Sequence, residues 1–224
     1  MVDMASMYFK DRIEAGQKLL EQMNVYSANN AVISISTTAA LIANQIAQAM
    51  QCPLQLYLEE AITVPGGLDI GSVNQHGQFQ YASDISAGHQ EYFYQEFRGY
   101  IEESKRASFS SLNRELKGRE TIRNDLLQNR DIYIVTDCLD SLVPVHSLVQ
   151  SIKSVSYKSI TLCSPIAMSK DTSEIKHMSD KSHILGLIDF FFGVDHYYED
   201  NTVLARENVI KVISDTLKLW PISK

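Results

Sequence analysis

Apolar residues form two kinds of pattern along this chain, and segments of the two kinds alternate. The runs at 31–35 and 132–135 are mostly apolar and rich in β-branched residues, which is typical of buried strands. The segments between such runs space their apolar residues three and four positions apart, as amphipathic helices do. Strands that alternate with helices predict an α/β fold, in which helices cover a central parallel sheet on both faces.

The same pattern predicts an order of elements. We expect strands at 31–35, 54–58, 132–135, 157–165 and 183–188, and helices at 7–23, 39–50, 88–120, 145–155, 170–179 and 203–219. Residues 61–67 are expected to form a turn-rich loop, and residues 68–82 a hairpin. Pro165 is expected to end its strand, and Ser108–Ser111 to break the long helix. Thr37 or Thr38 is a candidate cap for the helix that follows.

Composition makes this picture more specific. The chain has 224 residues, of which 45% are apolar and 21% charged, so one α/β domain spanning 1–224 is expected. The formal net charge of −7 argues against a broad nucleic-acid surface. No apolar run approaches the roughly 18 residues of a membrane span.

The cysteines and the N-terminal sequence bear on the compartment. Cys52, Cys138 and Cys163 are odd in number and scattered, which is typical of free thiols in a reducing compartment. The opening residues "MVDMASMYFKDR" lack a basic region followed by an apolar core, so no signal peptide is expected. The sequence therefore predicts a soluble cytoplasmic protein.

Two loops follow predicted strands at the edge where ligands of parallel sheets bind. One is Ser36–Ala39, after the strand at 31–35, and the other is Thr136–Val143, after the strand at 132–135. The second loop reads "TDCLDSLV" and carries two acids, which makes it the more informative of the two.

Four segments, in this order, resemble the predicted phosphoribosyltransferases of the type I phosphoribosyltransferase fold. They are "FKDRIEAGQKLL" (9–20), "GGLDIGSVNQHGQF" (66–79), "LNRELKGRE…LLQNRDIYIVTD" (112–137) and "FFGVDHYYEDN" (191–201). The resemblance implies a central parallel sheet flanked by helices, with a small hood built from the hairpin and the termini. It also implies the transfer of a phosphoribosyl group from phosphoribosyl diphosphate with Mg²⁺.

The loop after the central strand departs from that family. The family's D-D-G-x-A-T-G-A is replaced here by Thr136, Asp137, Cys138, Leu139, Asp140, Ser141 and Leu142. Two glycines are therefore missing, and glycine is the residue that lets a backbone approach an anion closely. Asp140 would also place a carboxylate near a bound phosphate.

The loop Ser36–Ala39 also lacks the family's phosphate-binding residues. The family's diphosphate loop, P-R-G-G, is replaced here by Ser36, Thr37, Thr38 and Ala39, without the arginine that would bind phosphate. A further basic position of the family corresponds to Glu59 or Glu60. We therefore expect a catalytically degenerate homologue that binds a nucleotide, a phosphorylated ligand or a protein partner through these loops. The alternative is an active phosphoribosyltransferase with an atypical loop.

Several residues allow more than one interpretation. Asp137 and Asp140 could hold Mg²⁺, but Asp140 or Ser141 could equally cap the next helix. Cys138 could be a reactive thiol, but a buried space-filler is the more usual role. Tyr92, Phe93, Tyr94, Phe97 and Tyr100 could stack on bases, but a core or a dimer interface explains such a stripe more simply. A homodimer is expected.

Overall fold

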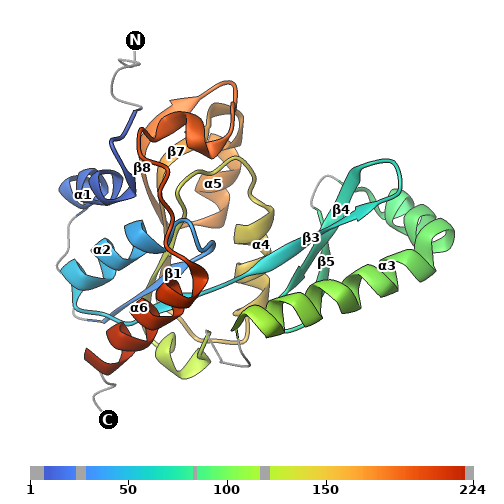
Figure 1. Ribbon diagram of the computed structural model, residues 1–224, viewed down its shortest axis with the longest axis horizontal. Coiled ribbons are helices and arrows are strands. Elements are labelled where there is room, and N and C mark those ends of the chain that lie inside the picture. The colour runs from blue at the N-terminus through green and yellow to red at the C-terminus, as the bar shows by residue number, and fades with distance from the viewer. Residues whose placement is uncertain (1–7, 24–28, 83–84, 117–121, 220–224) are drawn as a thin grey trace. The chain divides into compact units, whose positions relative to one another are not determined.

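A computed structural model describes residues 8–23, 29–82, 85–116 and 122–219 (Figure 1). The chain divides into two compact units. The first contains residues 1–56 and 122–224, and the second contains residues 57–121. Each unit has its own sheet, and each is described separately.

The first unit is built on a five-stranded parallel sheet in the order β2-β1-β6-β7-β8. The strands are β1 (Asn30–Ser34), β2 (Leu54–Leu56), β6 (Asp131–Val135), β7 (Ser159–Met168) and β8 (Lys181–Ile188). Nearly every residue of β1, β2 and β7 is buried, because helices cover both faces of a parallel sheet. The predicted parallel sheet flanked by helices is confirmed.

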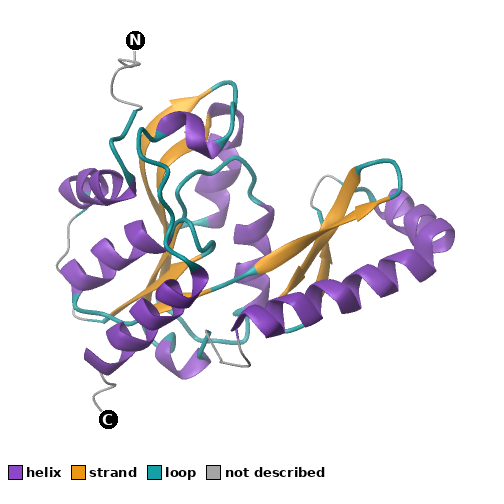
Figure 2. Cartoon of the chain, in the orientation of Figure 1, coloured by secondary structure: helices purple, strands orange, loops and turns teal. Residues whose placement is uncertain are grey.

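Five α-helices flank this sheet (Figure 2). They are α1 (Arg12–Gln22), α2 (Ala40–Met50), α4 (Val143–Ser151), α5 (Thr172–Met178) and α6 (Arg206–Leu219). In Figure 1, α1, α2 and α6 lie on one face of the sheet, while α4 and α5 lie on the other. For α2, α4 and α5 this arrangement follows from the strand order, since right-handed crossovers in opposite directions from the centre place their helices on opposite faces.

The second unit is a three-stranded antiparallel sheet with one long helix. Its strands are β3 (Glu59–Val64), β4 (Leu68–Asn74) and β5 (Phe79–Tyr81), and its helix is α3 (Ala87–Leu116). Its core joins the sheet to the helix and contains Ile62, Val64, Ile70, Val73, Phe93 and Ile101. The sequence-predicted hairpin at 68–82 corresponds to β4 and β5.

Three expectations about local structure are wrong. Residues 61–64 are strand rather than loop, because Ile62 and Val64 alternate with outward residues and only the Pro-Gly-Gly that follows turns the chain. Pro165 lies inside β7, beyond Cys163, the last residue that pairs with β6, and the pairing with β8 passes from Ser164 to Ile166 without it. Helix α3 runs through 108–111 and departs from helical geometry at Phe97 instead. Residues 117–120 of the expected helix lie outside the described residues.

Candidate functional site

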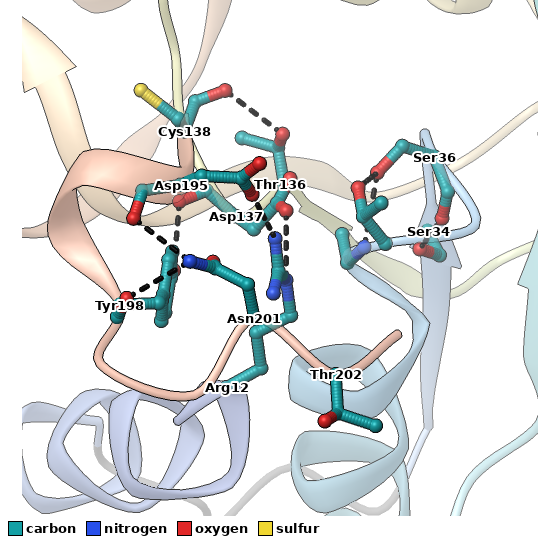
Figure 3. Close-up of polar contacts among 12 residues, drawn as sticks. Arg12, Ser34, Ser36, Thr136, Asp137, Cys138, Asp195, Tyr198, Asn201 and Thr202 are labelled. Carbon is teal, nitrogen blue, oxygen red and sulfur yellow. Dashed lines mark hydrogen bonds and ion pairs between the residues drawn. The ribbon is translucent and has the colours of Figure 1, made fainter. Parts of the chain in front are cut away.

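The two loops singled out from the sequence leave the sheet side by side. Strands β1 and β6 are parallel neighbours that pair up to Ser34 and Val135, and the N–H of Ile35 donates to the carbonyl of Val135 at 3.1 Å. The loops therefore start from the same edge of the sheet, as Figure 3 shows for Ser36 and Thr136. The prediction that both loops follow the carboxyl ends of sheet strands agrees with the structure, which also shows that the two strands are neighbours.

A buried ion pair involves Asp137, which stands at the second acid position of the central loop. Arg12, in the first turn of α1, is only 2% exposed, and its Nε lies 3.0 Å from Oδ2 of Asp137, which is 3% exposed. Ionised groups this deeply buried are normally paired, because the interior solvates them poorly. One carboxylate oxygen of Asp137 therefore accepts a hydrogen bond from a buried arginine (Figure 3).

Tyr198, near the C-terminal end of the chain, contacts both residues of this ion pair. The guanidinium of Arg12 lies 4.5 Å from the centre of the Tyr198 ring, and the hydroxyl of Tyr198 donates to the backbone carbonyl of Asp137 at 2.9 Å. Burial raises the pKa of Tyr198 far above its ordinary value, and the nearby Asp137 raises it further, so the phenol stays protonated. One tyrosine thus contacts both partners of the ion pair.

The segment that carries Tyr198 also pairs with the residues just before α1. Phe9 forms a parallel bridge with Tyr198, and the N–H of Phe9 donates to the carbonyl of Tyr197 at 2.9 Å. The N–H of Glu199 donates in turn to the carbonyl of Phe9. These bonds fix the residues before α1 against residues 197–199, which brings Arg12 to Asp137.

Two polar atoms in this cluster are buried without a hydrogen-bond partner among the described residues. They are Nη1 of Arg12 and Oδ1 of Asn201. The other groups of these side chains are bound: Nδ2 of Asn201 donates to the carbonyls of Asp195 and Tyr198, both at 3.0 Å. Nη2 of Arg12 lies 3.9 Å from the largely exposed carboxylate of Asp195.

The backbone of the central loop is engaged within the protein. The N–H of Leu139 donates to the carbonyl of Ile166 at 2.8 Å, and the carbonyl of Leu139 accepts from Met168 at 3.1 Å. Thr136 Oγ1 donates to the carbonyl of Cys138, and the N–H of Val143 donates to Ser141 Oγ. A phosphate loop needs several N–H groups that converge on one point, and two of the candidates are directed elsewhere.

The side chains of the central loop differ in burial and in pKa. Leu142 and Cys138, at the two positions where the family has glycine, are both buried. Desolvation raises the pKa of Asp140, as does the nearby Asp137, while the N–H groups of Asp140 and Ser141 lower it. Burial also raises the pKa of Cys138 to about 12, so its sulfur is a thiol and a poor nucleophile at neutral pH.

The loop after β1 is closed by its own hydroxyl groups. Ser36 Oγ accepts from the N–H of Ala39 at 3.0 Å and lies 2.9 Å from Thr38 Oγ1, while Ser34 Oγ donates to the carbonyl of Ser36. Ala39 is the N-cap residue of α2 and makes no side-chain cap bond. The prediction that Thr37 or Thr38 caps this helix is wrong, because Ser36 satisfies the nearest N–H one residue earlier.

Sequence reasoning missed four residues of this cluster: Arg12, Asp195, Tyr198 and Asn201. All four lie in the segments "FKDRIEAGQKLL" and "FFGVDHYYEDN", so the resemblance pointed to the segments without indicating their contact. Within the described residues, no group of three or more His, Cys, Asp or Glu side chains is arranged to hold a metal ion. Glu59 and Glu60, which stand where the family has a further basic residue, are the first two residues of β3 in the second unit.

Comparison with known proteins supports the fold. No known protein family matches the sequence, and no curated protein does. The structure of TT1426 from Thermus thermophilus is similar, with a TM-score of 0.71 and 18% identity over 93% of this chain and 98% of that one. The chain has a type I phosphoribosyltransferase-like α/β fold, as the sequence predicted.

Two further solved structures are less similar. A hypothetical protein from Neisseria gonorrhoeae with bound ppGpp has a TM-score of 0.48 and 9% identity, over 93% of this chain and 94% of that one. A purine phosphoribosyltransferase from Pyrococcus horikoshii has a TM-score of 0.43 and 11% identity, over 78% of this chain and 81% of that one.

Among the helices that the structure describes, none is long and apolar enough to cross a membrane.

Proposed function

We propose that this chain is a catalytically degenerate protein of the phosphoribosyltransferase fold, which acts by binding. Its partner would be a nucleotide, another phosphorylated ligand or a protein, bound at the edge of the sheet where the loops 36–39 and 136–142 meet. The observation that carries the proposal is the buried ion pair between Arg12 and Asp137.

That ion pair matters because it uses the one acid kept at the family's ribose-binding position. A carboxylate that contacts a ribose hydroxyl must face the ligand with free acceptor capacity. Asp137 is 3% exposed, and Oδ2 already accepts from Arg12. Releasing it would leave the guanidinium of Arg12 buried without a carboxylate at hydrogen-bond distance, which is costly.

Electrostatics supports the same conclusion. Asp140, Asp137 and the exposed Asp195 gather negative charge around the loops, and the cation of Arg12 is already paired. Phosphoribosyl diphosphate is a polyanion, so this distribution would repel it unless an added cation intervened. A partner with fewer negative charges suits the site better.

The second candidate is an active phosphoribosyltransferase with an atypical loop. It is favoured by the position of Asp137 at the carboxyl end of β6 and by the retained hydroxyl of Ser141. In this case Mg²⁺ would be held by Asp137 and Asp140, and Asp137 Oδ2 would have to exchange Arg12 for the ion or its water.

Calorimetry separates the two candidates. The chain would be titrated with millimolar phosphoribosyl diphosphate in MgCl₂, and turnover would be assayed with each common nucleobase. The proposal expects neither binding heat nor product.

Turnover that Asp137→Asn abolishes would overturn the proposal. The asparagine can still accept a hydrogen bond from Arg12, so the variant tests the charge and leaves the contact possible. Asp125→Asn is the matched control, because Asp125 is an exposed acid paired with Arg123, away from both loops along the chain. That variant should leave any turnover unchanged.

A further inference from the structure

The segment 189–200, "DFFFGVDHYYED", exposes apolar rings far more than the rest of the described chain. Phe190 is 75% exposed and Phe192 is 73% exposed, and no other large apolar side chain that the structure describes exceeds 55%. Together with the half-exposed Tyr8, these rings offer roughly 300–400 Å² of apolar surface, which is in the range of the largest patch on a typical monomer.

Specific contacts fix the backbone at Phe190 and place the ring of Phe192 beside His196. The hydroxyl of Tyr197 donates to the carbonyl of Phe190 at 3.2 Å, and the ring of Phe192 lies 5.4 Å from that of His196. His196 Nε2 lies 2.9 Å from the hydroxyl of Tyr8. A surface preorganised in this way loses little conformational freedom when a partner covers it.

The same segment is acidic. It contains Asp189, Asp195, Glu199 and Asp200, which are all exposed, and it contains no lysine or arginine. Hydrogen bonds from Thr202 lower the pKa of Asp200, and the nearby Arg12 and Lys10 lower it further. Of these two cations, Arg12 is buried and paired with Asp137, whereas Lys10 is exposed. The segment therefore combines exposed apolar rings with four exposed acids, which we call its acidic rim. Protein interfaces likewise join an apolar core to a polar rim.

We propose that segment 189–200 and Tyr8 form a docking surface for a polypeptide that carries Lys or Arg beside apolar side chains. Apolar side chains of the partner would cover Phe190 and Phe192, while its cations would meet Asp189, Asp195 and their neighbours. This inference rests on the binding role proposed above and assigns that role to a protein partner.

Charge decides between this partner and the others. A second copy of the chain would bring an identical acidic rim against the first, and like charges across an interface cost free energy. Nucleic acid and anionic lipid surfaces carry phosphates, which the same rim repels. A basic polypeptide is attracted by the rim and buries the rings.

The surface also reaches the candidate site. Asp195 belongs to the rim, and its carboxylate lies 3.9 Å from Arg12 Nη2 while 80% of its side chain is exposed. A partner cation that pairs with Asp195 would compete with this loose contact and leave the closer bond from Arg12 to Asp137 intact. Docking and the buried ion pair are therefore adjacent but separable.

The test uses three fluorescent synthetic peptides and the full chain. The first places Leu and Arg on one helical face, the second replaces Arg by Glu, and the third replaces Leu by Ala. Fluorescence anisotropy should show saturable binding of the Leu/Arg peptide only, and amide NMR shifts should map to residues 189–200 and Tyr8.

Variants give the decisive comparison. The double variant Phe190→Ser with Phe192→Ser should bind the Leu/Arg peptide at least about tenfold more weakly, as is usual when aromatic anchors of an interface are lost. Tyr92→Ser with Tyr100→Ser, two exposed aromatics of α3, is the matched control and should change nothing. Thermal melts should coincide, because all four rings are exposed.

Three results would overturn the inference. The first is that the Leu/Arg peptide does not bind at low salt. The second is that both double variants lose the same amount of affinity for this peptide. The third is that the phenylalanine double variant binds the peptide normally but has a lower mass in solution than the unchanged protein. The last result would identify a second copy as the occupant. None of these bears on the calorimetry with phosphoribosyl diphosphate, so failure here is distinguishable from failure of the proposed loss of catalysis.

Discussion

The side chains of Arg12 and Asp137 meet inside the first unit, although 125 residues separate them along the chain. This contact ties helix α1 to the loop after the central strand. Tyr198 contacts both partners, so three distant segments converge on one ion pair. A pair of this kind contributes little net stability against an apolar replacement, but removing one partner alone is costly.

Replacing Arg12 by Met should therefore destabilise the chain by about 3–5 kcal/mol, because Asp137 is left charged and buried without its partner. Urea unfolding followed by far-UV circular dichroism measures this loss. The methionine keeps most of the side-chain volume, so the change reports the charge more than a cavity.

The double variant Arg12→Met with Asp137→Asn provides the control. It removes both charges and should recover at least half of the stability lost in Arg12→Met, since no ion remains buried. A double variant no more stable than the single one would show that the packing of Arg12 against Tyr198, rather than its charge, holds the segments together.

Loss of the Tyr198 hydroxyl should have a smaller effect. Tyr198→Phe removes the donor to the Asp137 carbonyl and keeps the ring beside Arg12, so we expect a cost of about 1–2 kcal/mol. Tyr8→Phe, which removes an exposed hydroxyl bonded to His196, should cost less than about 0.5 kcal/mol. Equal losses in the two variants, measured by urea unfolding, would contradict the importance assigned to the buried bond.

The sheet could be predicted from sequence because it depends on local apolar runs such as 31–35 and 132–135, which are visible without knowledge of distant contacts. The placement of loops 36–39 and 136–142 at the carboxyl ends of strands followed from the rule for ligand sites in parallel sheets, whereas the pairing of β1 with β6 came from the structure. The Arg12–Asp137 contact could not be predicted in the same way, because nothing in the spacing of two residues 125 apart reveals that they meet.

Local misreadings had a different cause. Pro165 and the turn at 65–67 are strong local signals, and both were given too much weight against their surroundings. Pro165 is tolerated in β7 because it lies beyond the pairing with β6 and between residues that pair with β8, and the local sequence does not show this.

Asp140 and Asp125 should respond to pH with opposite signs. The folded state raises the pKa of Asp140 through desolvation, so ionised Asp140 opposes folding at neutral pH. Asp140→Asn should therefore be more stable than the wild type at pH 7, by less than about 1 kcal/mol. The difference should vanish below the ordinary pKa of about 3.9, where both folded and unfolded states carry a neutral group.

Asp125 is the counterpart. The hydrogen bond from Arg123 lowers the pKa of Asp125, so its charge favours folding above the unfolded pKa, and that contribution is lost as the pH falls through the folded pKa. Asp125→Asn should lower stability slightly at pH 7 and have less effect in acid. Urea midpoints at neutral and acid pH would measure both variants, and a shift of the same sign in both would refute the assignment.

Gly71 and Gly99 provide a test within the second unit. A Cβ atom at Gly71 would lie 2.1 Å from the carbonyl oxygen of Gln80 and 2.9 Å from Cα of Tyr81, so β4 and β5 cannot keep their register around it. Gly71→Ala should cost more than about 2 kcal/mol and speed amide hydrogen exchange in β4 and β5. At Gly99 of α3 no atom outside its own stretch of helix backbone lies within 4 Å of the added Cβ, so Gly99→Ala should stabilise the helix by up to about 1 kcal/mol. Exchange rates in β1 and β6 of the first unit should be unchanged in Gly71→Ala if the two units open separately. Acceleration of both sheets together would show that the chain unfolds as a single cooperative domain.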